Sequence, residues 1–328
     1  MIKLFAVLVS AFLAGSASAA PHGILWADGQ KALHIQKDGK GDATKTTGLQ
    51  YYGGPVISNA KIYAVFWGDN VPAETKTKIG PFFASMVDSV YMDWLKEYAT
   101  NLNAVDGRAG TNQTIGRGTF GGAITIKPAI QAKDLLDADV QKELEAQIAA
   151  GKLPKQTDDS LYMVYFPAGV SIAIEGEKSC SSFCAYHEGF KAAGGSIFYG
   201  VMPVCGGWGC GGGFDSMTAV SSHEAIEAIT DPFPTPGSKP AYPQAWNDSQ
   251  GEEISDLCAS ESAKLTAHGV TSSVSGQWKN SIKGCFNGPW QSTVAGPAEA
   301  FAALAARKPG APLMASLAAP MCWDGAKN

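Results

Sequence analysis

The chain is 328 residues long, a length that suits one large domain or two modest ones. Its hydrophobic content of 45% and charged content of 17% exclude a long disordered protein, and its 38 glycines and 18 prolines indicate a globular, loop-rich fold. Lysine and arginine number 25 against 30 aspartate and glutamate residues, so we expect no nucleic-acid partner and no binding to anionic membranes.

Residues 1–19 have the pattern of a cleaved signal peptide. Lys3 precedes an apolar run over residues 4–13, and residues 17–19 (ASA) have the A-x-A spacing that signal peptidase accepts. The run is shorter than the roughly 20 apolar residues that a spanning helix needs, and no later segment reaches that length. We therefore expect a secreted protein, extracellular or periplasmic, with no membrane span.

The next elements predict a sheet covered by helices. Residues 20–50 are polar and mixed, and they predict an extended N-terminal arm to which no function is assigned. Runs rich in β-branched and aromatic residues predict three buried strands of one sheet, over residues 61–68, 161–166 and 196–202. Helical spacing of apolar residues predicts amphipathic helices over 78–99 and 134–150, the second ended by Gly151.

This order of elements favours an α/β or α+β fold, with helices packed on a central sheet. We expect a single domain over residues 51–290. After Trp290 the composition shifts to alanine and proline, so residues 291–328 predict a peripheral tail with a short helix over 297–307. No repeat of solenoid or propeller period is present.

All seven cysteines lie in the second half of the chain, where export makes disulfides the expected state. They are Cys180, Cys184, Cys205, Cys210, Cys258, Cys285 and Cys322. We expect three bridges that stabilise this half and a spare Cys322. The connectivity stays open, because six cysteines allow 15 pairings. The alternative is a zinc site formed by the first four cysteines.

The segment over residues 221–232 (SSHEAIEAITDP) carries the pattern of a metal-binding helix. His223 and Glu227 are four residues apart, so they project from one face of a helix and can bind one ion together. Glu224 stands next to the first ligand, where metallopeptidases with an H-E-x-x-H helix have their general base. The motif here is H-E-x-x-E, and the second carboxylate should leave a water ligand less acidic than a three-histidine site does.

The bounds of this helix follow from its flanking residues. Ser221 or Ser222 is expected to cap its start, and Asp231 to end it because the next residue is Pro232. Its remaining positions are apolar, which predicts a buried helix. Buried carboxylates require a counter-ion.

A third ligand must come from elsewhere, and Gly251–Cys258 (GEEISDLC) supplies the best candidates. We favour Asp256, with Glu253 as the substitute ligand or as a supporting residue. His187 is another candidate, although we favour a structural, hydrogen-bonded role for it. Zinc is the expected ion, and the oxygen-rich ligand set also suits calcium or manganese.

The competing hypothesis has no metal at all. A short exposed helix often carries a histidine and two glutamates on its solvated side, so H-E-x-x-E arises readily by chance. Other catalytic patterns are missing from the sequence, because no G-x-S-x-G elbow, P-loop or dinucleotide fingerprint stands in a fitting context.

Landmarks in chain order resemble the Exordium-like (phosphate-induced protein 1) family of secreted proteins. They are residues 51–56 (YYGGPV), 65–68 (VFWG), 153–154 (LP), 161–162 (LY), 165–169 (YFPAG), 180–187 (CSSFCAYH) and the cysteines at 205 and 210. The resemblance spans residues 50–290. It implies an extracellular or cell-wall location and no settled reaction, since the plant members are associated with growth and cell expansion.

Microbial relatives of that family often have an H-E-x-x-E-A-x-T-D-P helix followed by G-x-E-I-x-D-L-C. Those patterns match residues 223–232 and 251–258 of this chain. The resemblance implies that His223, Glu224 and Glu227 belong to the metal helix, and that Glu253 and Asp256 belong to the acidic segment that returns to it.

The sequence thus predicts an exported α/β protein with a zincin-like layout. His223, Glu227 and Asp256 are expected to bind zinc, and Glu224 to deprotonate a water for attack on the carbonyl of a peptide or protein substrate. The second hypothesis is a non-enzymatic secreted cell-wall or signalling protein with a structural metal ion. No particular oligomeric state is predicted.

Overall fold

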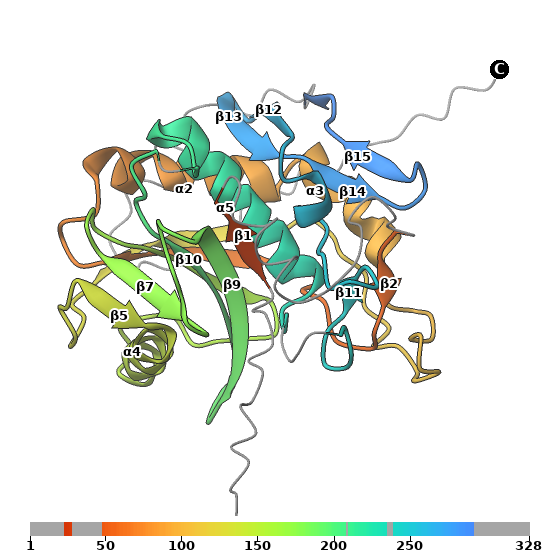
Figure 1. Ribbon diagram of the computed structural model, residues 1–328, viewed down its shortest axis with the longest axis horizontal. Helices are drawn as coiled ribbons and strands as arrows, with labels where there is room; N and C mark the ends of the chain where they lie inside the picture. The colour runs from red at the N-terminus through yellow and green to blue at the C-terminus, as the bar shows by residue number, and fades with distance from the viewer. Residues whose placement is uncertain (1–22, 28–47, 208, 235–238, 292–328) are drawn as a thin grey trace, which may run out of the picture.

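The computed structural model describes residues 23–27, 48–207, 209–234 and 239–291, and its centre is a six-stranded sheet (Figure 1). In spatial order the strands are β1 (Ile24–Trp26), β9 (Phe183–Ala192), β10 (Gly195–Met202), β6 (Ser160–Tyr165), β3 (Lys61–Trp67) and β4 (Thr119–Ile126). The last four strands are parallel to one another, whereas β9 runs antiparallel to β10 and β1 runs antiparallel to β9.

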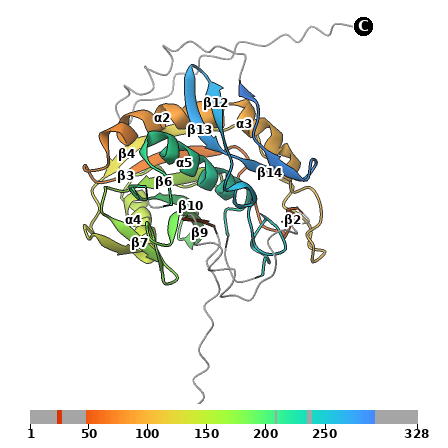
Figure 2. The ribbon, with the colours of Figure 1, turned by 45° about the horizontal axis from the view of Figure 1, so that its top comes forward.

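Helices cover both faces of this sheet. Helices α2 (Ala73–Val87) and α5 (Gly213–Thr230) lie on one face and α4 (Asp137–Ala149) lies on the other (Figure 2). Successive side chains of a strand point to opposite faces, so β3 and β6 feed two apolar cores. In β3, Ile62, Ala64 and Phe66 face α2 and α5, while Tyr63, Val65 and Trp67 face α4. The fold is therefore a three-layer α/β arrangement.

Smaller elements surround these layers. They are β2 (Gln50–Tyr51), α3 (Val90–Asp93), the 3-10 helix η1 (Trp94–Tyr98), β5 (Asp134–Leu136), β7 (Ser171–Ile174), β8 (Glu177–Lys178), β11 (Trp246–Asn247), the 3-10 helix η2 (Asp256–Cys258), β12 (Ser262–Ala267), β13 (Val270–Ser275), β14 (Gln277–Lys279), β15 (Gly284–Phe286) and β16 (Trp290–Gln291). The β12–β13 hairpin packs on α5, and β11 pairs with β2.

The α/β class and the central sheet with packed helices are confirmed. The three expected strands are β3, β6 and β10, which lie side by side. The expected helix over 134–150 is α4, which starts at Asp137 because the preceding residues form β5, and it ends before Gly151 at φ +64°.

The expected single helix over residues 78–99 is wrong. Helix α2 ends at Val87, and α3 and η1 follow after a break. Ser89 causes the break, since its hydroxyl donates to the carbonyl of Met86 and accepts from the amide of Tyr91, so it caps a new helix.

Three disulfides are confirmed in the second half of the chain. They join Cys180 to Cys205, Cys184 to Cys210 and Cys258 to Cys285. The first two bridges use all four cysteines of the alternative zinc site, so these sulfur atoms are bonded to one another. Cys322 lies outside the described residues.

The N-terminal region differs from the expected arm. Ile24–Trp26 joins the central sheet as β1, and Gln50, the last residue of the expected arm, belongs to β2, because Ile24 and Leu49 bury their side chains against the domain. The predicted signal peptide and nearly all of the predicted C-terminal tail, including its helix, lie outside the described residues. Among the described residues, no helix is long and apolar enough to cross a membrane.

Candidate metal centre

Helix α5 carries the H-E-x-x-E motif in its buried half. The helix begins at Gly213, not at Ser221 or Ser222 as expected, and its last residue Thr230 stands before Asp231, the predicted end. Both serines lie inside the helix: the hydroxyl of Ser221 lies 2.9 Å from that of Tyr165 on β6, and Ser222 donates to the carbonyl of Ala219. The expectation of a buried helix is met.

The predicted ligands meet in one group. The Nε2 atom of His223 lies 3.1 Å from Oε1 of Glu227 and 3.6 Å from Oδ1 of Asp256. The backbone N–H of Asp256 donates to Oε1 of Glu227 at 3.0 Å, which ties the start of η2 to α5. One ligand atom from each of the three residues lies within 4.8 Å of the others, a spacing that can hold a metal ion.

A second group shares Glu227 with the first. His187, on β9, places its Nδ1 atom 3.3 Å from Oε2 of Glu224 and 3.8 Å from Oε2 of Glu227. Its Nε2 atom lies 3.1 Å from the carbonyl oxygen of Asp231 and 3.5 Å from Oε1 of Glu253. His187 is therefore hydrogen-bonded, as expected, and also adjacent to the predicted catalytic glutamate.

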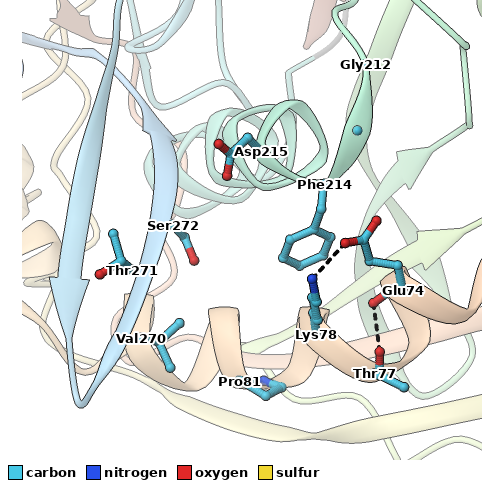
Figure 3. A pocket seen from close by; sticks show the side chains of 11 residues that line it. Glu74, Thr77, Lys78, Pro81, Gly212, Phe214, Asp215, Val270, Thr271 and Ser272 are labelled. Carbon is cyan, nitrogen blue, oxygen red and sulfur yellow. Dashed lines mark hydrogen bonds and ion pairs between the residues drawn. The ribbon is translucent and has the colours of Figure 1, made fainter.

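The cluster is sealed from solvent in this conformation. Glu224, Glu227, Glu253 and His187 are fully buried, His223 is 2% exposed, and the side chain of Asp256 is 10% exposed. Residues of α5 do line a pocket of about 580 Å³, shown in Figure 3, but they come from its first turn. Phe214 lies against Lys78 of α2 there, with Nζ of the lysine 5.6 Å from the centre of the ring. No residue of the H-E-x-x-E motif lines that pocket.

Burial shifts the pKa values of the cluster strongly. It raises the pKa of Glu224, Glu227 and Glu253 above their ordinary values. It lowers the pKa of His187 to about 3, so this imidazole is neutral. Burial also opposes protonation of His223, but the neighbouring Glu227 and Asp256 outweigh it and hold its pKa well above the ordinary value.

Several buried polar atoms of the cluster have no hydrogen-bond partner among the described residues. They are Oε1 of Glu224, Oε2 of Glu227 and both carboxylate oxygens of Glu253. Within the described chain, the ion-pair partners of these three glutamates are histidines. Acceptor atoms thus face other acceptors, an arrangement that a bound cation or added protons must stabilise.

Neighbouring residues fix the positions of these side chains. The Oδ1 atom of Asp231 accepts from the amide of Ala245 at 2.8 Å, and its Oδ2 atom accepts from the side-chain amide of Asn247, so the chain around β11 is held at the end of α5. The Cys258–Cys285 bridge stands two residues after Asp256. The hydroxyl of Ser275 lies 3.4 Å from Nδ1 of His223, the position of a group that orients a ligating imidazole.

Two contributions to the site escaped the sequence analysis. Ser275 is one of many serines, and nothing in its neighbours signals a contact with His223. Residues 23–27 read as part of a polar arm, yet β1 contacts α5 as well as β9. The apolar side chain of Ile24 was the available sequence signal for this packing. A three-residue strand is too short to show the alternation of apolar and polar residues that identifies a strand.

Comparison with known proteins adds no assignment to this geometry. Neither the protein-family models, nor the curated proteins, nor the solved structures contain a match to the chain.

Proposed function

We propose that the protein is a secreted, zinc-dependent hydrolase of the zincin-like type that cleaves peptide bonds. His223, Glu227 and Asp256 hold the ion, and Glu224 is the general base. The observation that carries the proposal is the set of buried carboxylate oxygens without a hydrogen-bond partner on Glu224, Glu227 and Glu253, beside the His223–Glu227–Asp256 group whose spacing can hold an ion. Export is supported by the signal-like first 19 residues and by three disulfides, which belong to oxidising compartments.

The donor set favours zinc over harder cations. An imidazole nitrogen and two carboxylate oxygens are ordinary zinc ligands, and three protein ligands leave the open position that a catalytic site needs. Calcium takes six to eight oxygen ligands, more than this group offers. Manganese remains the second choice. We also propose that the chain is a microbial-type member of the Exordium-like family, on the motifs quoted above.

Glu224 is placed to move the protons of a hydrolysis. Its carboxylate accepts a proton as a water oxygen attacks the substrate carbonyl, and it returns that proton to the amide nitrogen as the C–N bond breaks. The products are one carboxylic acid and one amine, so a single water is consumed. Bound zinc would acidify the attacking water and polarise the carbonyl. The neutral His187, 3.3 Å from Glu224, holds the base in position.

A raised pKa suits the role of Glu224. Burial pushes the pKa upward, and the positive charge on His223 together with the backbone N–H of Leu25 pulls it down. A general base is most effective when its pKa lies near the working pH.

The complete burial of the cluster favours a second candidate function. A closed site of this kind also fits a structural ion in a non-enzymatic cell-wall or signalling protein, because structural zinc sites keep no open position. Calcium found in the purified protein would favour this candidate.

The Glu224→Gln variant separates the two candidates. We expect it to retain zinc and to lose peptide hydrolysis by about a hundredfold or more, because the general base is gone. The control is Glu253→Gln, which alters a buried carboxylate of the same cluster outside the proposed ligand set. Unchanged hydrolysis in Glu224→Gln would contradict the enzyme proposal. An unaltered protein that binds zinc but cleaves no peptide from a diverse library would favour the structural ion.

A further inference from the structure

One edge of the central sheet is covered by a strand from the start of the described chain. Without β1, strand β9 would be the exposed edge. The backbone N–H of His187 donates to the carbonyl of Gly23 at 2.9 Å, and the N–H of Ala27 donates to the carbonyl of Ser182 at 3.1 Å. Strand β1 thus pairs with β9 at the edge of the sheet and also contacts α5 (Figure 1).

This edge runs directly beside the proposed catalytic group. His187, which pairs with Gly23 through its backbone, points its imidazole at Glu224. Strand β1 contacts α5, and the backbone N–H of Leu25 lies near enough to the Glu224 carboxylate to lower its pKa. A polypeptide lying in the place of β1 therefore has its backbone amides within reach of the general base.

The contacts of β1 are those that an extended peptide makes when it adds a strand to a sheet. Main-chain hydrogen bonds provide affinity with little dependence on sequence, and pockets for alternate side chains provide selectivity. The side chain of Ile24 is 1% exposed and belongs to the apolar core on the α4 side of the sheet. An apolar side chain at that position is thus part of what the edge recognises.

The position before Ile24 has room for glycine alone. Gly23 has φ +66°, and a Cβ atom there would lie 2.7 Å from the carbonyl oxygen of His187 and 2.8 Å from Cγ of Pro234. A real Cβ atom does not approach backbone this closely, so any side chain would push the strand away from β9.

We propose that the β9 edge beside Glu224 is the binding site for an extended polypeptide, with glycine followed by an apolar residue, and that residues 23–27 occupy it as an internal blocking strand. The part of the proposal that names this polypeptide as substrate rests on the hydrolase function proposed above. The closure of the cluster is then a property of the blocked state, and displacement of β1 opens the catalytic group to substrate.

The Gly23→Ala variant tests the proposal, because its methyl group displaces β1 without altering any ligand. The matched control is Gly176→Ala, in the turn between β7 and β8. Gly176 also has a positive φ, +88°, but an added Cβ there would meet no atom within 4 Å. Both variants carry the same kind of backbone strain, and the clash belongs to Gly23→Ala alone.

Binding is measured by fluorescence anisotropy with a labelled peptide of the sequence Gly-Ile-Leu-Trp-Ala, that of residues 23–27. In the unaltered chain and in Gly176→Ala the tethered β1 competes at high effective concentration, so we expect weak binding. In Gly23→Ala we expect binding at least about tenfold tighter. Ile24→Ala, which removes the buried anchor and creates no clash, is expected to behave like Gly23→Ala.

Circular dichroism identifies the variants that remain folded. Equal peptide binding by the unaltered chain and the folded variants would overturn the proposal. So would the failure of folded Gly23→Ala and Ile24→Ala to bind the peptide.

Hydrolysis of the same peptides by the zinc-loaded proteins separates the two proposals. Tighter binding in Gly23→Ala without hydrolysis would support the occupied edge and contradict the hydrolase. Hydrolysis by the unaltered chain as fast as by Gly23→Ala would support the hydrolase and contradict the blocking strand.

Discussion

A partly buried carboxylate, Asp137, and the buried carboxylate cluster around α5 lie on opposite faces of the central sheet, and adjacent residues of β9 contact both. On the α4 side, Asp137 accepts hydrogen bonds at 2.6 Å from the hydroxyls of Tyr186 and Tyr199 and at 2.7 Å from the amide of Gln141. On the α5 side, His187 faces Glu224, Glu227 and Glu253, several of whose oxygens find no donor among the described residues.

The difference shows what a structural carboxylate requires in this fold. In the first turn of α4, the carboxylate of Asp137 has a hydrogen-bond donor for each of its oxygens. Around α5 the fold brings acceptors together and leaves them unpaired, which destabilises the protein unless a cation binds. The contrast between Asp137 and the α5 cluster is the main physical argument for a metal centre.

The largest expected effect is stabilisation by zinc. Zinc at a thousandfold excess over its dissociation constant should raise the free energy of unfolding by about 4 kcal/mol, since it binds the folded state alone. Thermal unfolding with and without zinc measures this gain. Asp137→Asn should keep the increment and Glu227→Gln should lose it. An equal increment in both variants would place the ion elsewhere.

Removal of the disulfide beside Asp256 should affect both stability and metal affinity. Replacing Cys258 and Cys285 by serine opens a bridge with a sequence separation of 27 residues, and loss of such a loop constraint lowers the free energy of unfolding by about 3 kcal/mol. Zinc affinity should also fall by about tenfold, because Asp256 is less well held.

The matched control for that double variant is the Cys180–Cys205 bridge, with a sequence separation of 25 residues. Its replacement by serines should lower stability by a similar amount and leave zinc affinity unchanged. The measurements are urea unfolding of the metal-free proteins and calorimetric zinc titration. Equal loss of zinc affinity in the two double variants would argue against Asp256 as a ligand.

Substitution of Asp137 and substitution of a carboxylate of the α5 cluster should have opposite effects on the metal-free protein. Asp137→Ala leaves two buried tyrosine hydroxyls without their acceptor and should lower the free energy of unfolding by about 1–3 kcal/mol. Glu253→Gln removes a buried charge that has no hydrogen-bond donor, and in mildly alkaline buffer it should raise that free energy by about 1 kcal/mol. Urea unfolding tests both, and destabilisation of equal size would remove the contrast.

The smallest expected effect is a change in pH dependence at Asp137. Burial raises its pKa above the ordinary 3.8, against the opposing hydrogen bonds from Tyr186, Tyr199 and Gln141. The folded carboxyl therefore holds its proton more tightly than the unfolded one, so its contribution to stability falls as pH rises from 3.8 through the raised pKa. Asp137→Asn should remove this slope. A steeper fall in the variant than in the unaltered chain would contradict the assignment.

Much of the fold could be predicted from sequence because its signals are local. The runs that form β3, β6 and β10 are buried on both faces, so their composition identifies them without partners. The break after α2 could not be predicted in the same way, because the apolar period continues past Ser89 and the hydrogen bonds of that serine depend on the folded backbone.

The residues of the candidate site also differ in whether local sequence could predict them. His223, Glu224 and Glu227 share one helix, so their spacing alone places them together. Asp256 was predicted from its acidic sequence segment, and in the structure it lies beside His223. The contribution of β1 depends instead on a strand pairing between residues separated by more than 150 positions. No local pattern encodes that pairing, and the same holds for the contact of Ser275 with His223.

Elemental analysis of the purified protein, after dialysis against a weak chelator, tests the metal centre most directly. The comparison includes the unaltered chain, His223→Ala and Asp137→Asn. We predict about one zinc ion per chain in the unaltered protein and in Asp137→Asn, and its loss from His223→Ala. Absence of metal from all three, with no uptake when zinc is added, would contradict the account, and so would full zinc retention by His223→Ala.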